Sequence, residues 1–136
     1  MKIFIDTNIL IDSLLKRHPF YKTSDDVINK CLTEKVMIYI AAHSVTNAFY
    51  IMRKVYSEEQ RREILLEICN LFDIVEINRK KIIMCLNNSK FKDFEDCLQS
   101  ECALSVKADY IITRNIKDFA NSAVKPILPE DFLDLF

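Results

Sequence analysis

Short apolar runs rich in β-branched residues alternate along this chain with segments whose apolar residues recur at helical spacing. The apolar runs cover residues 2–5, 36–42, 74–77 and 109–113. Strands that are separated by helices pair in parallel, and strands that are apolar almost throughout lie in a sheet covered on both faces. The pattern therefore predicts a three-layer α/β/α fold around a central parallel sheet of about five strands.

The boundaries of several helices are predicted from capping signals. The spacing of Thr23 and Asp26 resembles a capping box, and Ser57 with Gln60 forms a second one. Asn78 is expected to cap the following helix. The other expected elements are helices over residues 44–56 and 93–107, a helical turn over 115–119, a strand near 124–128, and a last helix from Pro129.

Glycine is absent from all 136 residues. The P-loop, the dinucleotide-binding turn and the nucleophile elbow of α/β-hydrolases all require glycine. ATP binding through a P-loop, NAD binding through a dinucleotide turn and α/β-hydrolase activity are therefore excluded. Helices in such a chain must end on Asn, Asp or Lys instead of a glycine C-cap. No repeat or linker divides the sequence, and we expect residues 1–136 to form a single domain.

Charge and targeting signals restrict the possible partners. The formal net charge is −1, so a nucleic acid would have to be attracted by a local patch or by a metal ion. No apolar run approaches the roughly 20 residues of a membrane span, and no signal peptide is visible. The five cysteines form no C-x-x-C pair. We therefore expect a cytoplasmic protein with free thiols and no membrane partner.

Acidic side chains follow the predicted strands at positions that converge in a parallel sheet. Asp6 comes directly after the first strand, and Asn115 and Asp118 follow the fourth. Asp93 and Asp96 share one face of the helix that leads into the fourth strand. Each acid alone also fits a helix cap or a solvated surface position. Together they predict a site for Mg²⁺ or Mn²⁺ and metal-assisted phosphodiester hydrolysis.

Four segments in order, KIFIDTNILID, NAFYIMRK, DFEDCLQSECA and YIITRNIKDF, resemble PIN-domain proteins, and more narrowly the VapC-like branch of ribonuclease toxins. The resemblance covers nearly the whole chain. It implies the sheet order 3-2-1-4-5, an acidic pocket that binds Mg²⁺ or Mn²⁺, and endonucleolytic cleavage of RNA. It also implies a homodimer and inhibition by a small antitoxin protein.

The resemblance also assigns residues. By position, Asp6, Asp96 and Asp118 match the family's catalytic, metal-binding acids. Asp6 and Asp96 are expected to hold one metal ion, and Asp118 to assist or to contribute to a second. Arg114, or lysines such as Lys90 and Lys92, are candidates for steering the RNA backbone. The residues expected to support the pocket are Asn8, Asn47, Asp93, Glu95, Thr113 and Asn115.

One position departs from the usual family pattern. Asn47 stands where many VapC-like proteins have a glutamate, and an amide carries no charge and cannot act as a base. Glu95 is a candidate to restore the missing charge. The alternative is a catalytically weak PIN-like module that binds RNA or a protein partner. A phosphoryl-transfer domain of the haloacid-dehalogenase or response-regulator type also places an Asp after its first strand, but Asn8 occupies the position of the second dehalogenase acid.

Overall fold

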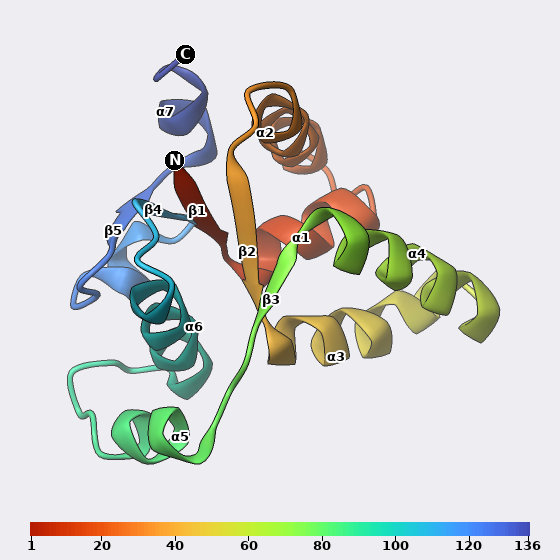
Figure 1. The fold of residues 1–136 in the computed structure, drawn as a ribbon. Helices are drawn as coiled ribbons and strands as arrows, with labels where there is room; N and C mark the ends of the chain where they lie inside the picture. Colours follow the sequence, from red (N-terminus) through yellow and green to blue (C-terminus); the bar gives the residue numbers. More distant parts are fainter.

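The computed structural model describes residues 1–136 and contains one five-stranded parallel sheet in the order β3-β2-β1-β4-β5 (Figure 1). The predicted fold class and strand order are confirmed. Each strand lies within or overlaps a run that the sequence pattern marked as extended. The strands are β1 (Lys2–Ile5), β2 (Met37–Ala41), β3 (Asp73–Val75), β4 (Tyr110–Ile112) and β5 (Lys125–Ile127).

Helices cover both faces of this sheet (Figure 1). None of them has the length and apolar character needed to cross a membrane. The α-helices are α1 (Thr7–Leu14), α2 (Tyr21–Thr33), α3 (Ala42–Ile51), α4 (Glu58–Leu71), α5 (Arg79–Leu86), α6 (Phe94–Ser105) and α7 (Pro129–Leu133), and the two 3₁₀ turns are η1 (Met52–Lys54) and η2 (Ile116–Phe119).

The alternation of side chains along β1 divides the core into two layers. Ile3 and Ile5 belong to a cluster of 17 buried residues that joins the sheet to α1, α2, α3, α4 and α7. Phe4 points to the opposite face and belongs to a cluster of 9 buried residues that includes α6 and η2. β1 is the central strand of the sheet and is buried on both faces. It therefore fixes the place of the residue that follows it, Asp6.

The predicted capping box at Thr23 is wrong. Helix α2 begins two residues earlier, at Tyr21, and no side chain caps it. The backbone N–H groups of Tyr21 and Ser24 already donate to the carbonyls of Arg17 and Phe20, so Thr23 lies inside the first turn. The loop before the helix supplies the capping acceptors through its backbone, and no local sequence pattern records such contacts.

Three other helices begin as their sequences predict. Ser57 and Gln60 form a complete capping box, in which each side chain accepts from the other residue's backbone N–H. The side chain of Asn78 accepts from the backbone of the third residue of α5. Asp93 caps α6 and accepts from the N–H of Asp96 at 3.0 Å. This last cap fixes the orientation of the helix that carries most of the acids.

Lysine takes the place of glycine at three helix ends, as the absence of glycine predicts. Lys16, Lys35 and Lys107 follow the ends of α1, α2 and α6 with φ angles of 52°, 57° and 56°. At the end of α6, the N–H of Ala108 donates to the carbonyl of Ala103 and the N–H of Lys107 donates to the carbonyl of Leu104, which is a Schellman motif. The left-handed conformation is therefore required by the hydrogen bonds that close the helix.

We expect Lys107→Gly to raise the free energy of unfolding by about 0.5–1 kcal/mol, because glycine adopts a positive φ without the steric cost that Cβ imposes. The greater flexibility of glycine in the unfolded chain offsets part of this gain. Urea denaturation measures the change. The control is Lys107→Ala, which keeps the Cβ. An equal gain in the alanine variant would show that the side chain, not the backbone angle, is the cause.

Candidate acidic active site

Acidic and amide side chains line one pocket of about 240 Å³ where the carboxyl ends of the strands meet α1, α3, α6 and η2. The structure brings eight of the nine predicted site residues to its wall, and the ninth, Thr113, lies directly behind it. The eight residues are Asp6, Asn8, Asn47, Asp93, Glu95, Asp96, Asn115 and Asp118.

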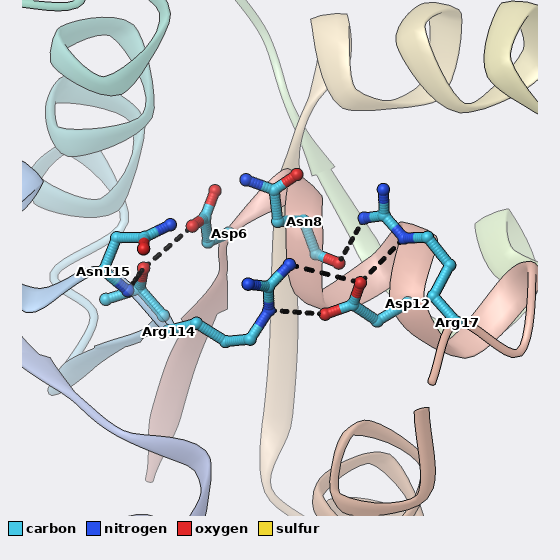
Figure 2. Close-up of polar contacts among 7 residues, drawn as sticks. Asp6, Asn8, Asp12, Arg17, Arg114 and Asn115 are labelled. Atoms are coloured by element: carbon cyan, nitrogen blue, oxygen red, sulfur yellow. Dashed lines mark hydrogen bonds and ion pairs between the residues drawn. The ribbon is translucent and has the colours of Figure 1, made fainter. Parts of the chain in front are cut away.

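Asp6 lies at the bottom of this pocket, only 3% exposed. Its Oδ1 accepts a hydrogen bond from Nε2 of Gln99 at 2.9 Å, and its Oδ2 accepts from Oγ1 of Thr113 at 2.8 Å. Figure 2 shows the carboxylate beside Asn115, whose backbone N–H donates to Thr113 in turn. Burial raises the pKa of Asp6, and the two side-chain donors oppose that rise.

Three neutral residues that support Asp6 were missed by the sequence analysis. Oε1 of Gln99 accepts from the backbone N–H and the hydroxyl of Thr7, at 2.9 and 3.1 Å. The hydroxyls of Thr7 and Ser44 lie 2.6 Å apart, so the chain of contacts continues into α3. One signal was available for Gln99, because it follows Asp96 by three residues and shares its face of α6.

Asp96, at the start of α6, is a strongly perturbed acid of the pocket wall. Partial burial, followed by the charges of Asp93, Asp6 and Asp118, raises its pKa to about 7. None of the ion pairs in the chain involves an acid of this pocket. No lysine or arginine therefore forms a direct ion pair with these acids, and the one arginine charge that acts on Asp6 is that of Arg114, outside the pocket.

Asn47 and Glu95 connect the two sides of the pocket. Nδ2 of Asn47, on α3, donates to Oε2 of Glu95, on α6, at 3.4 Å. His43 lies one turn before Asn47, and neither of its buried ring nitrogens has a hydrogen-bond partner. Burial lowers the pKa of His43, against the opposing charges of Glu95, Asp6 and Asp93. The imidazole is therefore neutral at neutral pH and adds no positive charge to the pocket.

The pocket acids lie close enough for their charges to interact, but not close enough to ligate one ion together. No three His, Cys, Asp or Glu side chains are grouped closely enough to hold a metal ion. Asp6, Asp96 and Asp118 thus share a pocket, but they do not converge within ligating distance. Carboxylates at this density repel one another, and both oxygens of Asp6 already accept hydrogen bonds.

The donor atoms of the pocket nevertheless fit a hard divalent cation. The polar groups on its wall are carboxylates, amides and a hydroxyl, which are the oxygen donors that Mg²⁺ and Mn²⁺ prefer. Burial first, and then the charges of the neighbouring acids, raise the pKa of Asp96. A cation between the carboxylates would relieve the part that comes from repulsion. The unpaired negative charge and the oxygen donors of the pocket both favour a hard divalent cation as its ligand.

A larger hollow of about 630 Å³ lies on another part of the surface, between β3, α5 and α6. It contains none of the predicted site residues. Its two acids, Glu76 and Glu101, lie near the lysines Lys80 and Lys81, so its charges are mixed. Size alone would select this hollow, but the smaller pocket holds the concentrated carboxylates and the perturbed pKa values.

The sheet order, with an acid after the central strand and further acids on α6 and η2, is that of a PIN-like domain. The comparison of sequences agrees: the family model described as PIN domain matches residues 2–117. The chain therefore belongs to the PIN-domain family, as its motifs predicted. Membership of this family excludes the alternative fold, a phosphoryl-transfer domain of the haloacid-dehalogenase or response-regulator type.

Relatives cover nearly the whole chain. Ribonuclease VapC1 from Aquifex aeolicus (strain VF5) is 25% identical over 137 aligned residues, which span 98% of this chain and 94% of the relative. The solved VapBC2 structure from Rickettsia felis, bound to a promoter DNA fragment, has a TM-score of 0.71 at 18% identity and covers 94% of this chain and 98% of that one.

A toxin–antitoxin complex from Klebsiella pneumoniae is also similar. Its TM-score is 0.66 at 23% identity, with 93% of this chain and 97% of that chain covered. At these identities the two solved structures support the fold, and the match in both directions shows that no large segment is added or lost between them and this chain.

We expect Thr113→Val to lower the free energy of unfolding by about 2 kcal/mol, because the variant removes a donor to a buried carboxylate without a change of shape. Chemical denaturation measures the loss. Thr33→Val is the matched control, since its hydroxyl donates to a helix carbonyl on the exposed surface. Equal effects of the two substitutions would contradict the assigned importance of the Asp6 contact.

Asp96→Asn should stabilise the protein in EDTA, and more so at higher pH. Between pH 3.8 and about 7 the folded state binds more protons at Asp96 than the unfolded state, so wild-type stability falls as pH rises. The variant lacks this penalty. After allowance for solvent screening, we expect a gain of about 1 kcal/mol near pH 8, or roughly 3 °C in melting temperature.

The gain from Asp96→Asn should shrink as the pH falls and vanish below about 3.8, where the wild-type carboxyl becomes protonated in both states. Thermal melts at several pH values test this. Glu101→Gln, on the same helix but outside the acidic pocket, is the control. A gain that does not depend on pH would argue against charge repulsion as its source.

Proposed function

We propose that this PIN domain, extending over residues 1–136, is a metal-dependent endoribonuclease and the toxin of a toxin–antitoxin pair. The observation that carries the proposal is the pocket of unpaired carboxylates at the carboxyl edge of the sheet, with Asp6 held in place from two sides. The name of the Aquifex relative, a ribonuclease, supports the same activity.

In this proposal Asp6, Asp96 and Asp118 are the catalytic residues and hold Mg²⁺ or Mn²⁺. Asp6 and Asp96 share the first ion, and Asp118, which is more exposed on η2, assists them or contributes to a second. Such an ion, if bound there, would supply polarisation of a phosphate group and a water of lowered pKa, the chemistry of a phosphodiester hydrolysis that leaves a 5′-phosphate and a 3′-hydroxyl.

The remaining residues orient the acids. Gln99 and Thr113 hold the Asp6 carboxylate in one rotamer, so that it requires little rearrangement to bind a cation. Asp93 fixes the first turn of α6 and with it the position of Asp96. The supporting residues in the proposal are Asn8, Asn47, Asp93, Glu95, Thr113 and Asn115.

The proposed partners are RNA as substrate, a small antitoxin protein and a second copy of the chain, in the cytoplasm. The solved complexes support an antitoxin, because their titles describe VapBC pairs and a toxin–antitoxin complex. The acidic pocket is a suitable target for a basic side chain of an inhibitor, since such a side chain would occupy the position of the metal ion.

The proposal is tested by cleavage of a panel of labelled RNAs with Mg²⁺, Mn²⁺ or EDTA. Wild type and the control Glu101→Gln should cut only in the presence of metal, and Asp96→Asn should lose at least about 100-fold in rate. Equal cutting by Asp96→Asn would indicate a contaminating nuclease and remove Asp96 from the site.

If the wild type cuts none of the RNAs, the affinity of the protein for a metal ion is measured next. Calorimetry with Mn²⁺ then compares the same proteins. Binding that disappears in Asp96→Asn supports the pocket as a metal site, whereas no binding by the wild type favours the alternative of a PIN-like module that binds RNA or a protein without hydrolysis. Asn47, an amide at a position where many VapC-like proteins have an acid, is the observation that keeps this second candidate.

A further inference from the structure

Two arginines meet on one buried carboxylate beside the acidic pocket. Asp12, on α1, has a side chain with 0% exposure. Its Oδ1 accepts from Nε of Arg17 at 2.8 Å, and its Oδ2 accepts from Nε of Arg114 at 2.7 Å. In Figure 2 the two guanidinium groups approach Asp12 from opposite sides. One arginine would neutralise the carboxylate, so the pair leaves a net positive charge at the surface.

Both guanidinium groups retain free donors and access to solvent. Each has five N–H groups, and the contacts with Asp12 and with the carbonyl of Asn8 use two in each case. The side chains of Arg17 and Arg114 are 37% and 25% exposed. Arg114 also lies 3.8 Å from the centre of the Phe20 ring, which holds the plane of its guanidinium.

This arginine pair borders the acidic pocket. Arg114 directly precedes Asn115, and Nη2 of Arg17 lies 3.4 Å from the carbonyl oxygen of Asn8. Both asparagines belong to the pocket wall, and Figure 2 places Asn8 between Asp6 and Arg17. A shallow hollow lined by Arg114, Asn115, Ile116, Lys117 and Asp118 continues from the pocket acids to the arginine.

We propose that Arg17 and Arg114 together bind a phosphodiester of the RNA strand that neighbours the scissile one. The inference rests on the proposed function. A polyanion approaching a pocket of unpaired carboxylates is repelled, and the net charge of the chain gives no general attraction. A fixed pair of guanidinium groups next to the acids supplies the attraction where it is needed.

Asp12 makes this pair suitable for a phosphate. The buried carboxylate holds both guanidinium groups before RNA arrives, so less side-chain entropy is lost on binding than with free surface arginines. The predicted alternatives, Lys90 and Lys92, lie in the exposed segment between α5 and α6, and no ion pair holds their side chains in place. The geometry therefore favours the arginines over the lysines for this contact.

The test measures binding of a short fluorescein-labelled single-stranded RNA by anisotropy in EDTA, in the Asp96→Asn background so that no cleavage occurs. Arg17→Gln should weaken binding about 3- to 10-fold and make the slope of log affinity against log salt shallower by about 0.7. Arg62→Gln is the matched control, because Arg62 is 66% exposed on α4, pairs with Glu58 one turn before it, and does not line the acidic pocket.

A second variant protects the test against loss of fold. Arg114→Lys keeps the charge but loses the planar fork, so it should weaken RNA binding while the salt slope stays nearly unchanged. Thermal melts check that each variant is folded. In wild-type background, Arg17→Gln should raise KM for RNA and leave kcat nearly unchanged, because Arg17 does not reach the reacting phosphate.

Two results would overturn the inference. One is that Arg17→Gln binds RNA with the affinity and salt slope of Arg62→Gln. The other is that the Asp96→Asn background binds no RNA at all under conditions of low salt. Neither result decides the proposed function, which depends on metal-dependent cleavage by the wild type, so the failure of one is distinguishable from the failure of the other.

Discussion

The burial of one carboxylate organises this molecule. Asp6 follows the central strand, and a charged group in that position is stable only if its oxygens are paired. Gln99 from α6 and Thr113 from the end of β4 provide the donors, from positions more than 90 residues away in the sequence. The same contacts that satisfy a buried acid thus bind the first strand to the second half of the chain, and they aim the carboxylate at the pocket.

Sequence analysis located the elements of the fold and the charged part of the site. The strands were visible because their apolar runs are nearly continuous, and their order came from the resemblance to PIN domains. The acids were found because Asp6, Asp96 and Asp118 each hold a definite place after a strand or on a helix face. Thr7, Ser44 and Gln99 were not found, since neutral polar residues carry no charge pattern and their partners lie far away in sequence.

The failed capping box at Thr23 has a related cause. A local pattern describes which side chains are able to cap a helix, but the backbone of the preceding loop decides where α2 starts. The acidic pocket adds a second kind of conflict, because its unpaired carboxylates oppose folding while they create a place for a cation. Stability and function therefore make opposite demands on the same few side chains.

The chain's lack of glycine also affects the unfolded state. A polypeptide in which every residue carries a Cβ samples fewer backbone conformations when denatured, so it loses less entropy when it folds. The lack of glycine also has a cost in the folded state. The lysines at the ends of α1, α2 and α6 each adopt a positive φ angle, which is unfavourable for a residue with a Cβ. The unfavourable backbone angles are thus confined to these three lysines, while the absence of glycine lowers the conformational entropy of the unfolded chain.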